Sequence, residues 1–278
     1  MKKIFFLLLI LIPFNIRALE TSAQSVILMD QDSKRILYSK DIHNVRSVAS
    51  ISKIMTAVVA LEKGNLNKKV TIGEEIIGAY GSGIYIKQGE KLTLKDLLYG
   101  LMLRSGNDAA LAIAYHVSGS VDKFVIEMNS LAKKIGMKNT TFNNPSGLDQ
   151  EKGNYSTSYD MALLQSYAMK NDTYRKIVGT KKYTLKTNKN VYVWHNKNKL
   201  LRMYEYTTGG KTGFTEKARR TLVTSASYNN LNLVVVTLND GNDFNDHKNL
   251  FEYGFNNYKR IKILKKGYLK IDGENYYK

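Results

Sequence analysis

The chain has 278 residues, 43% of them hydrophobic, and a formal net charge of +18. This length suits one large domain or two modest ones, and the apolar content excludes a largely disordered protein. Cysteine is absent, which excludes disulfide bonds and thiol chemistry. The four histidines are scattered and lack acidic or cysteine partners at the spacing of metal ligands, so we expect no metal and no other cofactor.

The N-terminus has the pattern of a secretory signal peptide. Two lysines precede the apolar run 4–14, and Ala18 is a small residue at the expected cleavage position. The run is short for a membrane span, so we expect residues 1–18 to be removed and the protein to be exported, either secreted or held at the cell envelope. The alternative is an uncleaved membrane anchor. Removing residues 1–18 takes away three basic residues and lowers the net charge from +18 to +15.

A chain this basic is attracted to anionic surfaces. Because an exported protein rarely meets nucleic acid, we expect a phosphate-bearing wall or membrane surface as the anionic partner, and no nucleic acid. The tail 259–278 contributes several basic residues, among them Lys259, Arg260, Lys262, Lys265, Lys266 and Lys270.

Both ends of the chain have the alternation and turn signals of β-strands. A polar turn at 30–35 predicts one hairpin, and Tyr228-Asn229-Asn230 predicts another. We expect strands in six segments: 25–29, 36–39, 183–185, 191–194, 220–227 and 231–238.

The middle of the chain is predicted to be mostly helical, because apolar residues recur at helical spacing behind capping residues. Residues 74–89 are expected to form a glycine-rich loop with a short strand, in which Gly81-Ser82-Gly83 is a turn. We expect helices at 50–63, 94–103, 109–117, 121–135 and 161–169, and a last one at 246–258. Strands from both ends and helices from the middle predict an α/β fold, with one antiparallel sheet built from the two termini and a helical subdomain inserted.

Ser50-Ile51-Ser52-Lys53 stands at the start of the first predicted helix. Residues three apart share a helix face, so the Lys53 amino group can reach the Ser50 hydroxyl. A serine needs an adjacent base to be a nucleophile, and a lysine can be that base if burial and the helix dipole lower its pKa. The same spacing at Ser120/Lys123 and Ser130/Lys133 has no supporting motif, and we interpret each as a helix N-cap with a solvated lysine.

Two further motifs follow in order. Ser105-Gly106-Asn107 lies at a break between predicted helices, where side chains can point into a cleft, and Lys211-Thr212-Gly213 precedes the last strands. The set S-x-x-K, S-x-N and K-T-G, here with gaps of 55 and 106 residues, is typical of penicillin-binding proteins and serine β-lactamases.

Five stretches resemble the low-molecular-mass penicillin-binding proteins of the D-alanyl-D-alanine carboxypeptidase family (peptidase S11 type). They are ASISKIMTA (49–57), NPSGLD (144–149), STSYDMA (156–162), NKNKLL (196–201) and GKTGFT (210–215). The resemblance covers about 21–258 and implies one catalytic domain of the penicillin-binding, serine β-lactamase-like fold, with a cleft between sheet and helices. Only the tail 259–278 follows, so we expect the second β domain of the family to be absent or vestigial. The stretch 217–220 is more basic than the resemblance leads us to expect.

The resemblance implies roles for three catalytic residues. Ser50 attacks the penultimate carbonyl of a peptide ending in D-Ala-D-Ala and forms an acyl-enzyme. Lys53, in its neutral form, takes the proton as general base, with Lys211 lowering its pKa by repulsion. Ser105 passes a proton to the departing amine.

The resemblance also implies five substrate-binding residues. Asn107 hydrogen-bonds the substrate backbone, Lys211 and Thr212 bind the terminal carboxylate, and Gly213 lets the substrate lie close to the strand. The backbone N–H groups of Phe214 and Ser50 are the expected oxyanion donors.

The function that follows is removal of the terminal D-Ala from peptidoglycan pentapeptides in cell-wall synthesis and remodelling, with β-lactams as inhibitors. A single-domain D,D-transpeptidase uses the same residues and differs only in the acceptor. A serine β-lactamase is less favoured, because no E-x-x-L-N pattern follows Ser105. A non-enzymatic wall-binding module would not explain the positions of Lys53 and Lys211.

Overall fold

The computed structural model describes residues 20–149 and 152–261. The predicted signal peptide, 1–18, and the tail from 262 onward lie outside the described residues. Within the described ranges, no helix is both long enough and apolar enough to cross a membrane.

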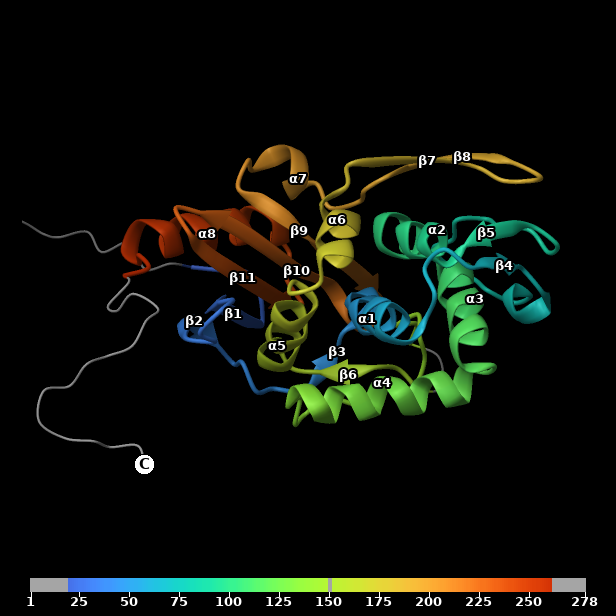
Figure 1. Ribbon diagram of the computed structural model, residues 1–278. Helices are drawn as coiled ribbons and strands as arrows, with labels where there is room; N and C mark the ends of the chain where they lie inside the picture. The colour runs from blue at the N-terminus through green and yellow to red at the C-terminus, as the bar shows by residue number, and fades with distance from the viewer. Residues whose placement is uncertain (1–19, 150–151, 262–278) are drawn as a thin grey trace, which may run out of the picture.

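A five-stranded antiparallel sheet, built from both ends of the chain, is the base of the fold (Figure 1). The strand order is β2-β1-β11-β10-β9, so a strand from the N-terminal end pairs with one from the C-terminal end, and β9 lies at an edge. The strands are β1 Ser25–Asp30, β2 Ile36–Lys40, β9 Thr207–Thr215, β10 Arg219–Tyr228 and β11 Leu231–Leu238. The predicted architecture is confirmed.

Helices cover both sides of this sheet and continue into the inserted subdomain (Figure 1). The helical segments are η1 Ala49–Ser52, α1 Lys53–Lys63, η2 Glu74–Ile76, α2 Leu94–Tyr99, η3 Gly100–Arg104, α3 Asn107–Ser118, α4 Val121–Ile135, α5 Ser158–Ala168, α6 Asp172–Gly179, α7 Leu200–Met203 and α8 Asp243–Asn257. Of these, η2, α6 and α7 were not predicted, because each has eight residues or fewer, which is too short for a helical pattern to stand out in the sequence.

The central strand β11 is apolar along most of its length because both of its faces are buried. Val234 and Val236 belong to the larger core, with side chains of α1 and α5. Leu233 and Val235 point the other way and pack in a smaller core with Leu250 of α8. Successive side chains of a strand point to opposite faces of the sheet. Each half of the β11 side chains is therefore buried in the core on its own face.

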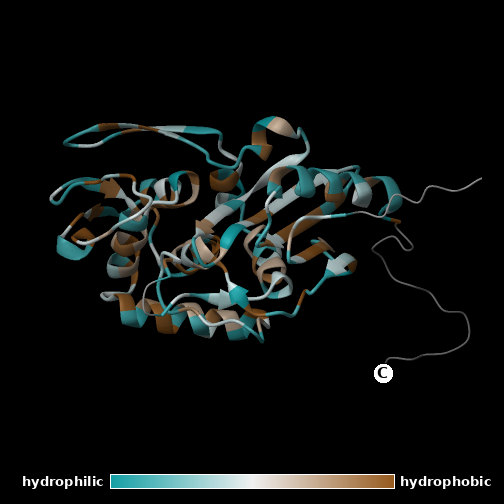
Figure 2. Ribbon diagram, turned by 180° about the vertical axis from the view of Figure 1, so that it is seen from behind, coloured by the Kyte–Doolittle hydropathy of each residue, from teal (hydrophilic) through white to brown (hydrophobic). Residues whose placement is uncertain are grey.

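The surface helix α4 has a mixed pattern in which polar and apolar residues alternate along the ribbon (Figure 2). Phe124 and Met128 are buried on its inner side. Ser120 caps the helix as predicted, because its hydroxyl accepts the backbone N–H of Lys123 at 3.2 Å. Ser130 lies inside α4, so the predicted N-cap there is wrong.

Short hairpins make up the rest of the described structure. The strand expected within 74–89 is not formed. The Asp108 carboxylate accepts the backbone N–H groups of residues 84–86, so these groups are not free to pair with a neighbouring strand. Short strands flank this loop instead, and a long hairpin reaches over α2 (Figure 1). The pairs are β3 Arg46–Ser47 with β6 Tyr155–Ser156, β4 Lys69–Thr71 with β5 Lys91–Thr93, and β7 Lys182–Lys186 with β8 Val191–His195.

His247 joins α8 to the sheet. The side chain is fully buried, with Nδ1 2.6 Å from the Thr224 hydroxyl on β10 and Nε2 3.0 Å from the Thr237 hydroxyl on β11. Burial lowers the pKa of His247 from 6.5 to about 3, so the folded protein holds the neutral imidazole.

We predict that acid destabilises the fold through His247. The unfolded chain takes up a proton below pH 6.5 and the folded chain does not, so this residue should remove about 2 kcal/mol of unfolding free energy between pH 7 and pH 5. Urea unfolding of wild type and His247→Gln at several pH values measures the difference in slope. The exposed His43→Gln is the control. Equal slopes in wild type and His247→Gln would contradict the prediction.

Candidate active site

The Lys53 amino group is enclosed at the start of α1. The side chain is fully buried, and its Nζ lies 3.0 Å from Ser50 Oγ and 2.7 Å from Asn107 Oδ1, and it also contacts the Ser146 carbonyl. Asn107 Nδ2 donates to the Tyr80 carbonyl at 2.6 Å, which sets the orientation of the amide. A neutral amine has two hydrogens and one lone pair. The two pure acceptors take the hydrogens, and the Ser50 hydroxyl can donate to the lone pair.

The charges around Lys53 favour this neutral form. Burial, and then the nearby cation Lys197, lower the pKa of Lys53 from 10.5 to about 7, while the negative charge of Asp108 acts in the opposite direction. Lys211 is buried as well, and burial, Lys53 and Lys197 hold its pKa well below its usual value. Burial was expected to lower the Lys53 pKa and does so, but the neighbouring cation that lowers it is Lys197 rather than the expected Lys211.

The loop 144–149 closes the site from below. In addition to the Ser146 carbonyl on Lys53, the Pro145 carbonyl accepts the Thr56 hydroxyl of α1 at 2.7 Å. Gly147 has φ +78°, and a Cβ there would lie 2.1 Å from the Ala49 carbonyl oxygen. Only glycine tolerates both the left-handed backbone and this contact. The sequence marked the loop as a turn, but gave it no part in the site.

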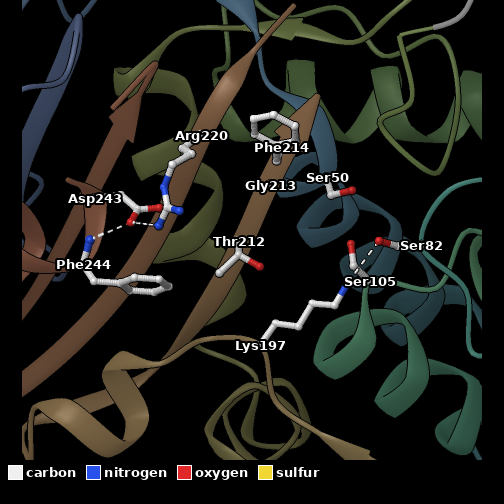
Figure 3. A pocket seen from close by; sticks show the side chains of 10 residues that line it. All are labelled: Ser50, Ser82, Ser105, Lys197, Thr212, Gly213, Phe214, Arg220, Asp243 and Phe244. Atoms are coloured by element: carbon white, nitrogen blue, oxygen red, sulfur yellow. Dashed lines mark hydrogen bonds and ion pairs between the residues drawn. The ribbon is translucent and has the colours of Figure 1, made fainter. Parts of the chain in front are cut away.

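Ser105 and Asn107 come from the break between η3 and α3. Ser105 has φ 65°, which turns the chain sharply and brings it to the wall of the cleft, while Asn107 starts α3 and points at Lys53. The cleft encloses about 300 Å³, the lower end of the range for small-molecule sites. Figure 3 shows its lining residues, which are Ser50, Ser82, Ser105, Lys197, Thr212, Gly213, Phe214, Arg220, Asp243 and Phe244.

The edge strand β9 forms the opposite wall. Thr212 and the largely exposed Phe214 line the cleft, and Lys211 turns inward and donates to the Thr212 carbonyl at 2.6 Å. A Cβ on Gly213 would lie 2.5 Å from Thr221 Oγ1 and 3.0 Å from the Ser50 nitrogen. Gly213 therefore lets the strand β9 and the turn that carries Ser50 approach each other. Its predicted role was to let the substrate lie close to the strand.

All eight residues singled out from the sequence lie in or directly beneath this one cleft. The structure adds Lys197, whose Nζ is 3.0 Å from Ser82 Oγ, and the ion pair of Arg220 with Asp243. Lys197 was within a stretch that carried the family resemblance, so a signal existed. Arg220 lies in the unusually basic stretch 217–220, and its partner Asp243 explains one of those charges.

Comparison with known proteins shows to which family the chain belongs. The family model for D-alanyl-D-alanine carboxypeptidases matches residues 13–242. The chain belongs to this family. The resemblance inferred from the five sequence stretches is confirmed.

Individual family members are similar over most of this chain. D-alanyl-D-alanine carboxypeptidase DacF of Bacillus subtilis (strain 168) is 38% identical over 220 residues, which are 77% of this chain and 56% of that protein. The D-alanyl-D-alanine carboxypeptidase of Streptomyces sp. (strain K15) is 39% identical over 217 residues, 72% and 74% of the two chains. The chain thus spans little more than half the length of the Bacillus relative.

Solved structures of the family share the fold. A penicillin-binding protein homologue from Mycobacterium tuberculosis matches with a TM-score of 0.83 and 30% identity, over 88% of this chain and 95% of that one. The Streptomyces K15 DD-transpeptidase matches with a TM-score of 0.81 and 34% identity, over 85% and 98%. The predicted penicillin-binding α/β fold is therefore confirmed.

We predict that acylation of Ser50 by a β-lactam rises with pH and is half-maximal near pH 7, because only neutral Lys53 accepts the hydroxyl proton. Lys53→Arg should fold and be nearly inactive, since a guanidinium does not deprotonate in this range. Stopped-flow acylation over pH 5–9 measures both effects. Lys63→Arg, at the exposed end of the same helix, is the matched control. A flat pH profile, or near wild-type activity in Lys53→Arg, would contradict the prediction.

Proposed function

We propose that the protein is a serine-type D-alanyl-D-alanine carboxypeptidase that removes the terminal D-Ala from peptidoglycan stem peptides through a Ser50 acyl-enzyme. The observation that carries the proposal is the buried Lys53 amine 3.0 Å from the Ser50 hydroxyl, with its two hydrogens taken by acceptors. A lysine in that arrangement is a base aimed at one serine.

The first half of the reaction is acylation. Ser50 Oγ attacks the carbonyl carbon of the penultimate D-Ala while its proton moves to Lys53. The C–N bond then breaks, and the proton held by Lys53 passes through the Ser105 hydroxyl at the cleft wall to the departing amine of the last D-Ala, which leaves Lys53 neutral again. In the second half, water attacks the acyl carbon and gives a proton to Lys53. The bond between the acyl carbon and Ser50 Oγ then breaks, and Lys53 returns the proton to Oγ, which restores Ser50.

Four residues are proposed to hold the carboxylate and the backbone of the substrate. Thr212 offers its hydroxyl to the terminal carboxylate. The side chain of Lys211 supplies the positive charge that favours this anion. Asn107 Nδ2 has two hydrogens, one of which goes to Tyr80, and the other suits a substrate carbonyl. Gly213 keeps the strand edge open beside Ser50.

The oxyanion of the tetrahedral intermediate is proposed to accept the backbone N–H groups of Ser50 and Phe214. The close approach of β9 to the Ser50 turn at Gly213 supports a position between these two donors. One such donor typically lowers the barrier by about 3 kcal/mol.

A D,D-transpeptidase is the second candidate, and one observation favours keeping it. The Streptomyces K15 protein is described both as a D-alanyl-D-alanine carboxypeptidase and as a DD-transpeptidase. Product analysis with a D-Ala-D-Ala peptide, with and without an added amine acceptor, separates hydrolysis from transfer. A transfer product that exceeds hydrolysis at low acceptor concentration would favour the transpeptidase.

We predict a long-lived covalent adduct between penicillin and Ser50. Among the cleft-lining residues that the structure describes, the only carboxylate is Asp243, which is engaged by Arg220, so these residues offer no free carboxylate base to speed hydrolysis of the adduct. Labelled penicillin followed by gel electrophoresis and mass spectrometry should show one adduct, lost in Ser50→Ala and kept in Ser130→Ala, the S-x-x-K serine within α4. Rapid penicillin turnover would instead indicate a β-lactamase, and label that persists in Ser50→Ala would exclude this nucleophile.

Export and attachment to an anionic surface are also proposed. Family members described as D-alanyl-D-alanine carboxypeptidases suggest a substrate outside the cytoplasm, and a net charge of +18 favours a phosphate-bearing wall or membrane surface. The basic tail from Lys259 onward is proposed to contribute to this attraction.

We predict that retention on purified wall is strong at low salt and mostly lost at 1 M, because the Debye length falls from ~10 Å at 0.1 M to ~3 Å at 1 M. Co-sedimentation over a salt series measures it. Deleting 259–278 should weaken retention without changing hydrolysis of a small peptide. The same assay compares the full-length protein with a form that lacks residues 1–18. If only the full-length protein is retained at high salt and is released by detergent, residues 1–18 are an uncleaved membrane anchor.

A further inference from the structure

Asp108 is a buried carboxylate whose hydrogen-bond partners, among the residues that the structure describes, are all backbone N–H groups. It follows Asn107 in the first turn of α3 and is 6% exposed. Its oxygens accept the N–H groups of Ile84 at 3.0 Å, Tyr85 at 2.7 Å and Ile86 at 3.3 Å, and of Ala109 at 2.8 Å. No ion pair to Asp108 occurs among residues 20–149 and 152–261, so these N–H groups stabilise the charge.

The loop that Asp108 gathers is strained. For three successive N–H groups to converge on one carboxylate, the chain must curl tightly, and Tyr85 has φ 60°, in the left-handed region. A bulky residue adopts this conformation only where its surroundings compensate for it. The hydrogen bonds to Asp108 are that compensation, because Tyr85 itself is largely exposed.

The same loop reaches the active site at three points. The Tyr80 carbonyl accepts Asn107 Nδ2 at 2.6 Å, and the Ser82 carbonyl accepts the Asn107 backbone N–H at 2.7 Å. Ser82 Oγ accepts Lys197 Nζ at 3.0 Å. The loop therefore sets the position of the amide that holds Lys53 and of the cation that faces it.

Asp108 also contributes charge to the surroundings of Lys53. The charged groups that face Lys53 come from three elements: Asp108 from α3, Lys197 from the segment after β8, and Lys211 from β9. Asp108 supplies the negative charge of this set and favours the protonated amine, which burial and Lys197 disfavour.

We propose that Asp108 is a positioning residue of the acyl-transfer site, acting through the loop 80–86 on Asn107 and Lys197 and through its negative charge on Lys53. This inference rests on the proposed function. Asp108 would then determine the shape of the cleft wall, and it would raise the pH at which Lys53 becomes a base.

The test is Asp108→Asn, which keeps the side-chain shape, removes the charge and turns an amide NH₂ toward backbone N–H groups. β-Lactam acylation, measured over pH 5–9, should slow at least tenfold at its plateau. Its midpoint should move to lower pH, because Lys53 loses the negative charge that favours its protonated form. Thermal melting and circular dichroism report whether the variant folds.

Asp96→Asn is the matched control. Asp96 is also buried and also binds a backbone N–H, that of Thr93 at 2.8 Å, as well as the Tyr183 hydroxyl at 2.5 Å, but its charge is not among those facing Lys53. It should lower the melting temperature and leave the pH midpoint at the wild-type value. A midpoint and plateau at wild-type values in Asp108→Asn would overturn the proposal and leave Asp108 a purely structural residue.

Asp108→Glu covers the case in which Asp108→Asn does not fold. The charge is kept but the longer side chain cannot make the same bonds, so the plateau should fall while the midpoint stays close to that of wild type. A plateau equal to wild type would overturn the positioning role. If wild-type protein forms no Ser50 adduct at all, the proposed function fails and this inference fails with it. If wild type reacts and the Asp108 variants behave like it, only this inference fails.

Discussion

The burial of the Lys53 amino group is the constraint on which the rest of the site depends. A buried ammonium is costly unless it is paired, and no carboxylate of the described residues lies within ion-pair distance of this one. The surrounding oxygens of Ser50, Asn107 and Ser146 suit a neutral amine instead. Burial lowers the pKa of Lys53 to about 7, and the two acceptors that take its hydrogens leave its lone pair for the Ser50 hydroxyl.

That burial requires several distant segments to meet at one point. The start of α1 carries Lys53, the start of α3 brings Asn107, and the loop 144–149 closes from below. The sheet adds β9 as an edge strand, with Gly213 against the Ser50 turn. The junctions at Gly147 and Gly213 are backbone contacts too close for a side chain, whereas Lys53 and Asn107 meet through their side chains, so the site is held by main chain as much as by side chains.

The electrostatics of the cleft are balanced around this amine. Burial and Lys197 disfavour its protonation and Asp108 favours it, so that the pKa of Lys53 is about 7. The Arg220–Asp243 pair beside β9 adds a cation whose charge is largely compensated.

The sequence alone determined the α/β class, the sheet built from both chain ends and the eight residues in or beneath the cleft, because strand alternation and three short motifs in order are local signals. It did not reveal Lys197, Ser82 or the role of the loop 144–149. These act through contacts between segments that are far apart along the chain, and a carbonyl or a buried carboxylate gives no sign in the sequence of what it will face. Only the tertiary structure decided that Asp108 would curl the loop 80–86 where a strand was expected. A side chain that captures three backbone N–H groups overrides the local preference of the segment that supplies them.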